Sequence, residues 1–217
     1  MTHDYRVQCC PRHLAAGRRN QVKVIDCTIR DGGLMNNWEF DHKLVKKTFR
    51  ALMNVGVDIM EVGYRSSEKV FDPGKYGRWR FCWEEDVQEV AERSDMKLST
   101  MVDIGKVEKG DIPNSADTLI DVVRIATYAH QLEECLEIAD HCLESGYDVF
   151  LNLMAVSAIT EKEMDDFLEA LATTPIRNVT LVDSFGALFP YHVRYLVIKY
   201  REYLGDRTLG IHAHNSQ

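Results

Sequence analysis

Two hydrophobic patterns alternate along the chain from Val22 onward. Short, almost continuously apolar runs are typical of strands that are buried on both faces. Between them, segments with apolar residues at every third or fourth position predict helices that cover a sheet. The predicted strands span 22–28, 57–63, 96–105, 119–127, 147–156, 178–186 and 208–215. The predicted helices span 41–55, 84–94, 130–145, 160–173 and 191–203.

The alternation of strands and helices predicts an α/β fold with a parallel sheet and helical crossovers. An open dinucleotide-binding sheet needs a glycine-rich turn that leads from the first strand directly into a helix. The turn here reads RDGG from Arg30 and continues past Trp38 before the predicted helix, so a TIM (β/α)8-type barrel is favoured. Because the seventh strand reaches the last residues, we expect a barrel truncated after strand seven, with the gap closed by further chain or by a partner.

Length and charge narrow the picture further. The 217 residues suit one barrel domain over 22–217, preceded by a polar N-terminal extension over 1–21. The 26 basic and 34 acidic residues give a net charge of −8, which disfavours binding to nucleic acid or to an anionic membrane. Apolar runs fall short of the roughly 20 residues of a membrane span, and the start lacks the apolar stretch of a secretion signal. We therefore expect a cytoplasmic protein.

Sulfur does not contribute a recognisable motif. The cysteines lack both the repeated spacing of a zinc site and the density of a disulfide scaffold. We therefore expect reduced thiols and assign no metal ligand to them. They are Cys9, Cys10, Cys27, Cys82, Cys135 and Cys142.

Ionisable and amide side chains occur where the predicted strands end. In a parallel barrel, catalytic groups lie at the C-terminal ends of the strands, where the chain runs out into loops. A convergence of such residues from several strands therefore predicts the functional site. The candidates, in chain order, are Arg30, Asp31, Glu61, Asn152, Asp183, His212, His214 and Asn215.

The strongest metal signal is a histidine pair. His212 and His214 are two positions apart on a predicted strand, so both imidazoles point to the same face. Strands one and seven of a closed barrel are about 10 Å apart, which allows Asp31 to share an ion with the pair. This set predicts a site for Mn²⁺ or Mg²⁺, with Co²⁺ or Zn²⁺ able to substitute and positions left open for a chelating substrate. The alternative is a pair of partly buried histidines satisfied by hydrogen bonds.

Arg30 is the candidate catalytic residue. An arginine beside a divalent ion can stabilise an enolate or oxyanion, whereas a solvated loop arginine is the ordinary alternative. Glu61 and Asp183 could each orient Arg30 or a metal-bound water, or only solvate the barrel mouth. Asn152 and Asn215 are further candidates for contact with a substrate.

Several motifs together resemble the DRE-TIM metallolyases. They are DCTIRDGGLMNNWEF from Asp26 to Phe40, IMEVGYR, LVDSFG and the terminal GIHAHN. The resemblance covers nearly all of the chain after Val22. This superfamily includes hydroxymethylglutaryl-CoA (HMG-CoA) lyase, 4-hydroxy-2-oxovalerate aldolase, isopropylmalate and homocitrate synthases, and the carboxyltransferase domain of pyruvate carboxylase.

The resemblance implies both roles and an activity. By position, Arg30 resembles the enolate-stabilising arginine of the family, and its metal ligands correspond to Asp31, His212 and His214. The RDGG variant looks most like the 4-hydroxy-2-oxovalerate aldolase branch. This implies a divalent-metal-dependent C–C lyase or aldolase that acts on a small 2-oxo or hydroxy acid. The histidine base that follows Arg-Asp-Gly in those aldolases is replaced here by Gly-Leu-Met.

Two other functions remain open, and a third is disfavoured by the sequence. One is an acyl-CoA-condensing synthase of the same superfamily, and another is a non-catalytic fragment or binding protein that keeps the metal site. Non-haem Fe(II) oxygenases share the ligand types, but the α/β order of elements argues against them. The expected partner is a small-molecule acid, and the sequence allows a homo-oligomer.

Overall fold

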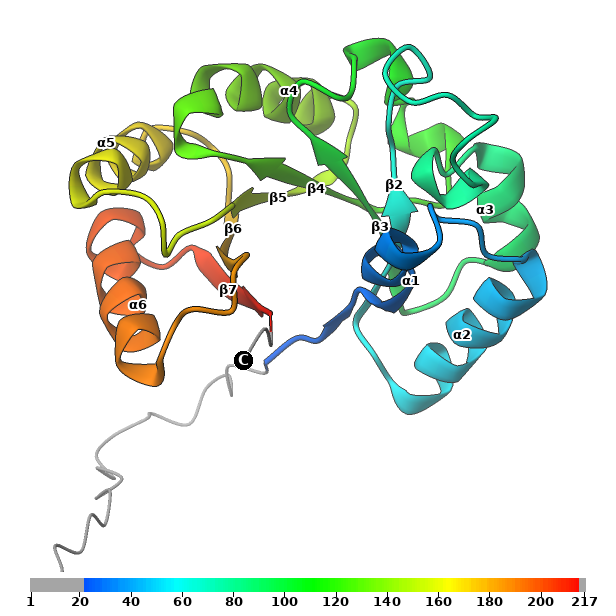
Figure 1. The fold of residues 1–217 in the computed structure, drawn as a ribbon, viewed down its shortest axis with the longest axis horizontal. Coiled ribbons are helices and arrows are strands. Elements are labelled where there is room, and N and C mark those ends of the chain that lie inside the picture. The colour runs from blue at the N-terminus through cyan, green and yellow to red at the C-terminus, as the bar shows by residue number, and fades with distance from the viewer. Residues whose placement is uncertain (1–21, 215–217) are drawn as a thin grey trace, which may run out of the picture.

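Seven parallel strands form one curled sheet in the computed structural model, which describes residues 22–214 (Figure 1). The strands pair in chain order, from the first to the seventh, which is the order of a TIM-type barrel. The truncated barrel predicted from the sequence is therefore confirmed. The strands are β1 (Ile25–Asp26), β2 (Ile59–Tyr64), β3 (Lys97–Asp103), β4 (Val122–Thr127), β5 (Asp148–Leu153), β6 (Asn178–Asp183) and β7 (Thr208–Ala213).

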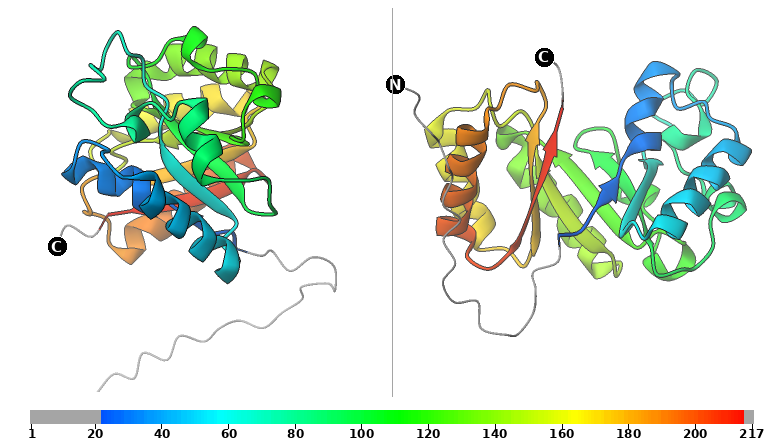
Figure 2. Two further views of the ribbon diagram at one scale, coloured as in Figure 1. Left: turned by 90° about the vertical axis from the view of Figure 1, so that its right-hand side faces the viewer. Right: turned by 90° about the horizontal axis from the view of Figure 1, so that it is seen from below.

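The longer helices lie on the outer side of the curl (Figures 1 and 2). The α-helices are α1 (Thr28–Gly32), α2 (His42–Val55), α3 (Glu84–Val90), α4 (Leu132–Glu144), α5 (Glu161–Ala172) and α6 (Pro190–Leu204). Short 3-10 turns are η1 (Gly33–Met35), η2 (Arg78–Arg80), η3 (Lys109–Asp111), η4 (Ser115–Asp117) and η5 (Ala129–Gln131). Within 22–214, no helix is both long and apolar enough to cross a bilayer.

Local sequence signals explain where the long helices begin and end. The Asp41 carboxylate accepts a hydrogen bond from the Leu44 backbone N–H at 2.7 Å and so caps the start of α2. Gly56 ends that helix in the left-handed conformation, with φ of 77°. At the start of α5, Thr160 and Glu163 form a reciprocal capping box. These helices therefore lie where the sequence predicts them.

The first predicted strand is shorter than expected, and the expectation that Arg30 and Asp31 terminate it in an irregular turn is wrong. Both residues belong to the short helix α1. The Asp26 carboxylate accepts hydrogen bonds from the N–H and the hydroxyl of Thr28, at 3.1 and 2.9 Å. This local bonding turns the chain out of β1 and into a helical turn, in which the Asp31 N–H bonds the Cys27 carbonyl.

The sheet separates an apolar face from a polar one. Met60 and Val62 on β2 are buried in the apolar core against α2, which contributes Val45 and Phe49. Between them on β2, Glu61 points to the opposite, inner side of the curl. The inner side is therefore able to hold charged groups.

Candidate metal centre

Strand register brings the polar side chains together on the inner side of the sheet. Paired residues on adjacent strands share a face, and alternate residues along one strand share it too. Applied together from β2 to β7, these two rules place a staggered set of polar residues on that face. The set consists of Glu61, Ser99, Arg124, Asn152, Thr180 and His212.

Glu61 is the centre of a buried charge network. Its side chain is completely buried, and its Oε2 accepts hydrogen bonds from Arg30 Nε and Arg124 Nη1, both at 2.8 Å. Burial alone would raise the pKa of Glu61, but the guanidinium groups of Arg124 and Arg30 hold it below its ordinary value. Glu61 therefore stays ionised and fixes the direction of both arginines.

Arg30 connects this network to the first candidate metal ligand. Its Nη1 pairs with the neighbouring Asp31 carboxylate, whose other oxygen, Oδ2, lies 3.6 Å from His212 Nε2. Asp31 is about one-third exposed, so the group can be reached from solvent. A residue of α1, which follows the first strand, thus meets a residue of the last described strand at the C-terminal ends of the strands.

His212 is held in the form that can bind a metal. Burial lowers its pKa to about 4, the Arg30 and Arg124 charges add to this effect, and Asp31 opposes it. Its imidazole is therefore neutral at neutral pH, which leaves a ring nitrogen lone pair for coordination. The His214 ring packs edge-on against it, with 4.9 Å between ring centroids.

Cys27 completes a compact group that the sequence did not predict. Its thiol lies with the Asp31 carboxylate and His212 such that one ligand atom from each is within 4.8 Å of the others. Arg124 Nη1 also lies 3.3 Å from the Cys27 sulfur. Arg124 was missed as well, although a lone arginine inside an otherwise apolar strand was a usable signal.

The remaining predicted residues fall into different positions. Asn152 touches the network through its Oδ1, 3.5 Å from Arg124 Nη2. Asp183 does not join it, because its two carboxylate oxygens accept hydrogen bonds from the Ala187 and Leu188 N–H groups, each at 3.0 Å. Asp183 therefore closes the loop between β6 and α6. Asn215 and the predicted extension over 1–21 lie outside the described residues.

An aromatic cluster fixes the backbone around Arg30. Trp38 Nε1 donates a hydrogen bond to the Arg30 carbonyl at 2.8 Å, and a β-carbon on Gly33 would lie only 2.0 Å from the Trp38 ring. The Arg80 guanidinium lies over the rings of Trp38 and Tyr64, at 4.5 and 4.1 Å from their centroids. These contacts hold α1, and with it Arg30, against the end of β2.

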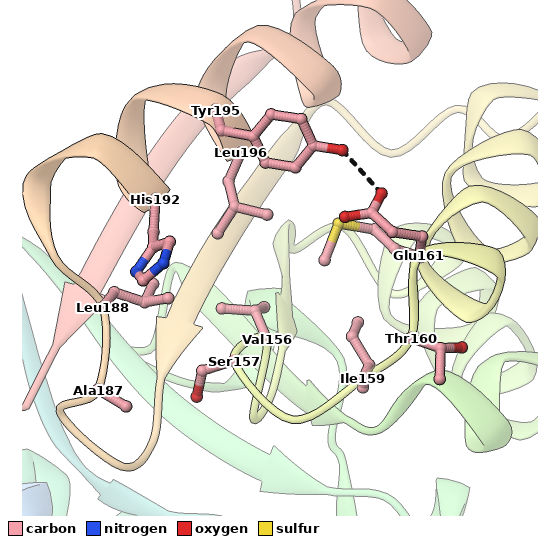
Figure 3. A pocket seen from close by; sticks show the side chains of 11 residues that line it. Val156, Ser157, Ile159, Thr160, Glu161, Ala187, Leu188, His192, Tyr195 and Leu196 are labelled. Carbon is pink, nitrogen blue, oxygen red and sulfur yellow. Dashed lines mark hydrogen bonds between the residues drawn. The ribbon is translucent and has the colours of Figure 1, made fainter.

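A cavity of about 260 Å³ lies elsewhere, between the β5–α5 loop and α6 (Figure 3). Its wall includes Leu188 and Leu196, and Tyr195 donates a hydrogen bond to Glu161 across it at 2.7 Å. The candidate metal ligands are not among its lining residues. The candidate metal centre around Asp31 therefore lies outside this cavity.

The residues around Asp31 fit a divalent ion. They offer an accessible carboxylate, a neutral imidazole and a thiol from three neighbouring positions. The nearby Arg30 and Arg124 charges are offset by Glu61 and Asp31, so an ion would not meet uncompensated positive charge. The arrangement can bind a cation and a substrate beside a fixed guanidinium.

Comparison with known proteins agrees with this fold. No protein-family model matches the chain. It is 26% identical over 202 residues to 4-hydroxy-2-oxovalerate aldolase 6 from Rhodococcus jostii, covering 91% of this chain and 56% of that protein. Thus the chain spans little more than half the length of this relative.

Two solved structures are also similar. The N-terminal domain of a "putative aldolase" from Bacteroides vulgatus matches with a TM-score of 0.79 and 28% identity, over 89% of this chain and 64% of that one. HMG-CoA lyase from Brucella melitensis matches with a TM-score of 0.68 and 14% identity, over 90% of this chain and 73% of that one, which supports the fold alone.

The curled parallel sheet and the charged group at its C-terminal edge define a TIM-barrel-type protein with a candidate metal centre. Together with the Arg-Asp-Gly and His-x-His motifs, these relatives support the DRE-TIM metallolyase superfamily that the sequence predicts.

Replacing Glu61 tests the buried network. Glu61→Gln leaves two buried guanidinium groups without their counter-charge, so we expect the free energy of unfolding to fall by about 3–5 kcal/mol. The control is Glu108→Gln, which removes an exposed pair with Lys69 and should leave the free energy of unfolding almost unchanged. Urea denaturation measures both values. Equal small losses would contradict a central role for the Glu61 network.

The depressed pKa of His212 predicts a pH effect on stability in the presence of a chelator. Between pH 6.5 and 4 the unfolded chain binds a proton at this residue and the folded chain does not, so stability falls as the pH decreases. From pH 7 to pH 5, wild type should lose about 1–2 kcal/mol more than His212→Gln. Urea titrations at the two pH values measure the difference, and parallel losses would show that His212 is not buried in its neutral form.

Proposed function

We propose that the protein is a divalent-metal-dependent lyase or aldolase that breaks a C–C bond of a small 2-oxo or hydroxy acid. The observation that carries the proposal is the placement of Arg30, which Glu61 fixes beside Asp31 and His212. The relatives named as aldolases support the same class of activity. The substrate, the metal and a cytoplasmic location stay predictions.

The residues suggest how such a substrate is handled. A bound divalent ion would supply Lewis-acid polarisation of a carbonyl oxygen, and the residues that would hold it are Asp31, His212 and His214. Arg30 presents a planar, permanently charged guanidinium to the same space. In an aldol cleavage, a base takes the proton of the 4-hydroxyl and a carbonyl forms at C4 as the C3–C4 bond breaks. The electron pair of that bond moves toward the 2-oxo group and forms an enolate. The role proposed for Arg30 is to stabilise this enolate.

Arg30 is not the only residue that balances the charge of the Glu61 carboxylate. Arg124 also pairs with Glu61, so Arg30→Lys keeps one guanidinium on the carboxylate and a positive charge at position 30. The substitution removes the planar fork and its fixed donors. It therefore separates stabilisation of the enolate from the general charge balance.

We expect Arg30→Lys to lower kcat for the cleavage by roughly 10²-fold or more, with little change in metal affinity. Pyruvate release from 4-hydroxy-2-oxo acids, measured beside thiol release from acyl-CoA substrates, distinguishes an aldolase from a condensing synthase. The matched control is Arg50→Lys on the exposed part of α2, which should behave as wild type. A kcat for Arg30→Lys close to that of wild type would contradict the catalytic role.

A further inference from the structure

Tyr64 is the last residue of β2, and a β-bulge turns its side chain to the inner side of the curl. Glu61 pairs with Ser99 on β3, but the register shifts between Glu61 and Gly63, and Tyr64 pairs with Met101. Ser99 and Met101 are two positions apart and share a face, so Tyr64 shares the face of Glu61. In a regular strand, residues three positions apart would point to opposite faces.

Two guanidinium groups flank the Tyr64 ring. The central carbon of the Arg30 guanidinium lies 5.9 Å from the ring centroid, and that of Arg80 lies 4.1 Å from it. Asp103, at the end of β3, provides a carboxylate on the same side, with its Oδ2 at 3.5 Å from Arg80 Nη2. The phenol therefore lies beside Arg30, the residue proposed to stabilise the enolate.

The hydroxyl of Tyr64 has no role in holding the fold together. Tyr64 is 7% exposed, and its hydroxyl forms no hydrogen bond with another residue of the described range 22–214. It is also not one of the fully buried polar atoms that lack a partner in this part of the chain, whereas the Tyr200 hydroxyl is one of them. The Tyr64 hydroxyl is therefore accessible to solvent and free to donate to a bound molecule.

The surroundings keep this hydroxyl protonated. Burial is the main cause that raises the pKa of Tyr64 to about 12. The charges of Arg30 and Arg80 lower this pKa, and those of Asp103 and Glu61 raise it. The phenol therefore carries its proton at neutral pH, as a proton donor must, and the two guanidinium groups can stabilise the phenolate that forms when the proton leaves.

We propose that Tyr64 is the proton donor that completes the cleavage, by protonating C3 of the enolate that Arg30 stabilises. This inference rests on the activity given under the proposed function. The phenol O–H bond breaks and a C3–H bond forms, so the enolate becomes a 2-oxo acid, and the phenolate then takes a proton from water. C3 is bonded to the carbon that carries the enolate oxygen, so a donor beside Arg30 is next to the atom that it must protonate.

Exchange of the methyl protons of pyruvate tests this assignment without knowledge of the other cleavage product. The reverse of the proposed step moves a C3 proton of pyruvate to Tyr64, so the full chain with Mg²⁺ or Zn²⁺ should exchange these protons in D₂O, measured by NMR. Tyr64→Phe keeps the ring and its contacts with the guanidinium groups and removes only the hydroxyl. We expect it to lower the exchange rate and kcat for pyruvate release by roughly 10²-fold or more, with KM and metal content little changed. The matched control is Tyr200→Phe on the outer helix α6, which should keep the wild-type rates.

The possible results separate this role from the proposed function. Wild-type exchange and kcat in Tyr64→Phe would overturn the role of Tyr64 and leave the proposed function intact, because the ring would then serve only to pack around Arg80. A loss of activity that comes with a higher KM and less bound metal would show a structural role and would also overturn it. A wild-type protein that neither releases pyruvate from 4-hydroxy-2-oxo acids nor exchanges its methyl protons would contradict the proposed function, and the role of Tyr64 with it.

Discussion

The paired guanidinium contacts of the Glu61 carboxylate are the interaction on which the candidate site depends. A completely buried carboxylate is costly to desolvate, and its contacts with Arg30 and Arg124 compensate that cost. The same contacts turn the Arg30 side chain toward Asp31 and hold Arg124 beside Cys27. One buried carboxylate thus organises the donors and the charges around the candidate ion.

The curl of the sheet supplies the second constraint. The curl brings the first and the seventh strand toward each other (Figure 1). Asp31 follows the first strand and His212 lies in the seventh, and their side chains come within 3.6 Å at the C-terminal edge. Because each parallel pair adds its own twist and tilt, seven strands in chain order bring the ends of the sheet toward each other. The order of the strands therefore makes this site possible.

Much of this architecture could be predicted from the sequence, because buried parallel strands and capped amphipathic helices leave strong local patterns. The helix between Asp41 and Gly56 is an example. The short helix α1 was missed because it depends on hydrogen bonds of a single side chain, Asp26. Cys27 and Arg124 were missed because their partners lie on other strands, and only the register shows that they share a face.

The central claim is a divalent ion held by Asp31, His212 and His214 beside Arg30, and the metal content of the protein tests it most directly. The protein tested carries Cys9→Ser and Cys10→Ser, so that these two adjacent thiols cannot bind the metal. After removal of metal and dialysis against a limiting Co²⁺ or Zn²⁺ solution, it should retain one ion per chain. The variant that also carries Asp31→Ala and His212→Ala should lose it while keeping its circular dichroism spectrum. Equal metal content in the two proteins would contradict the account.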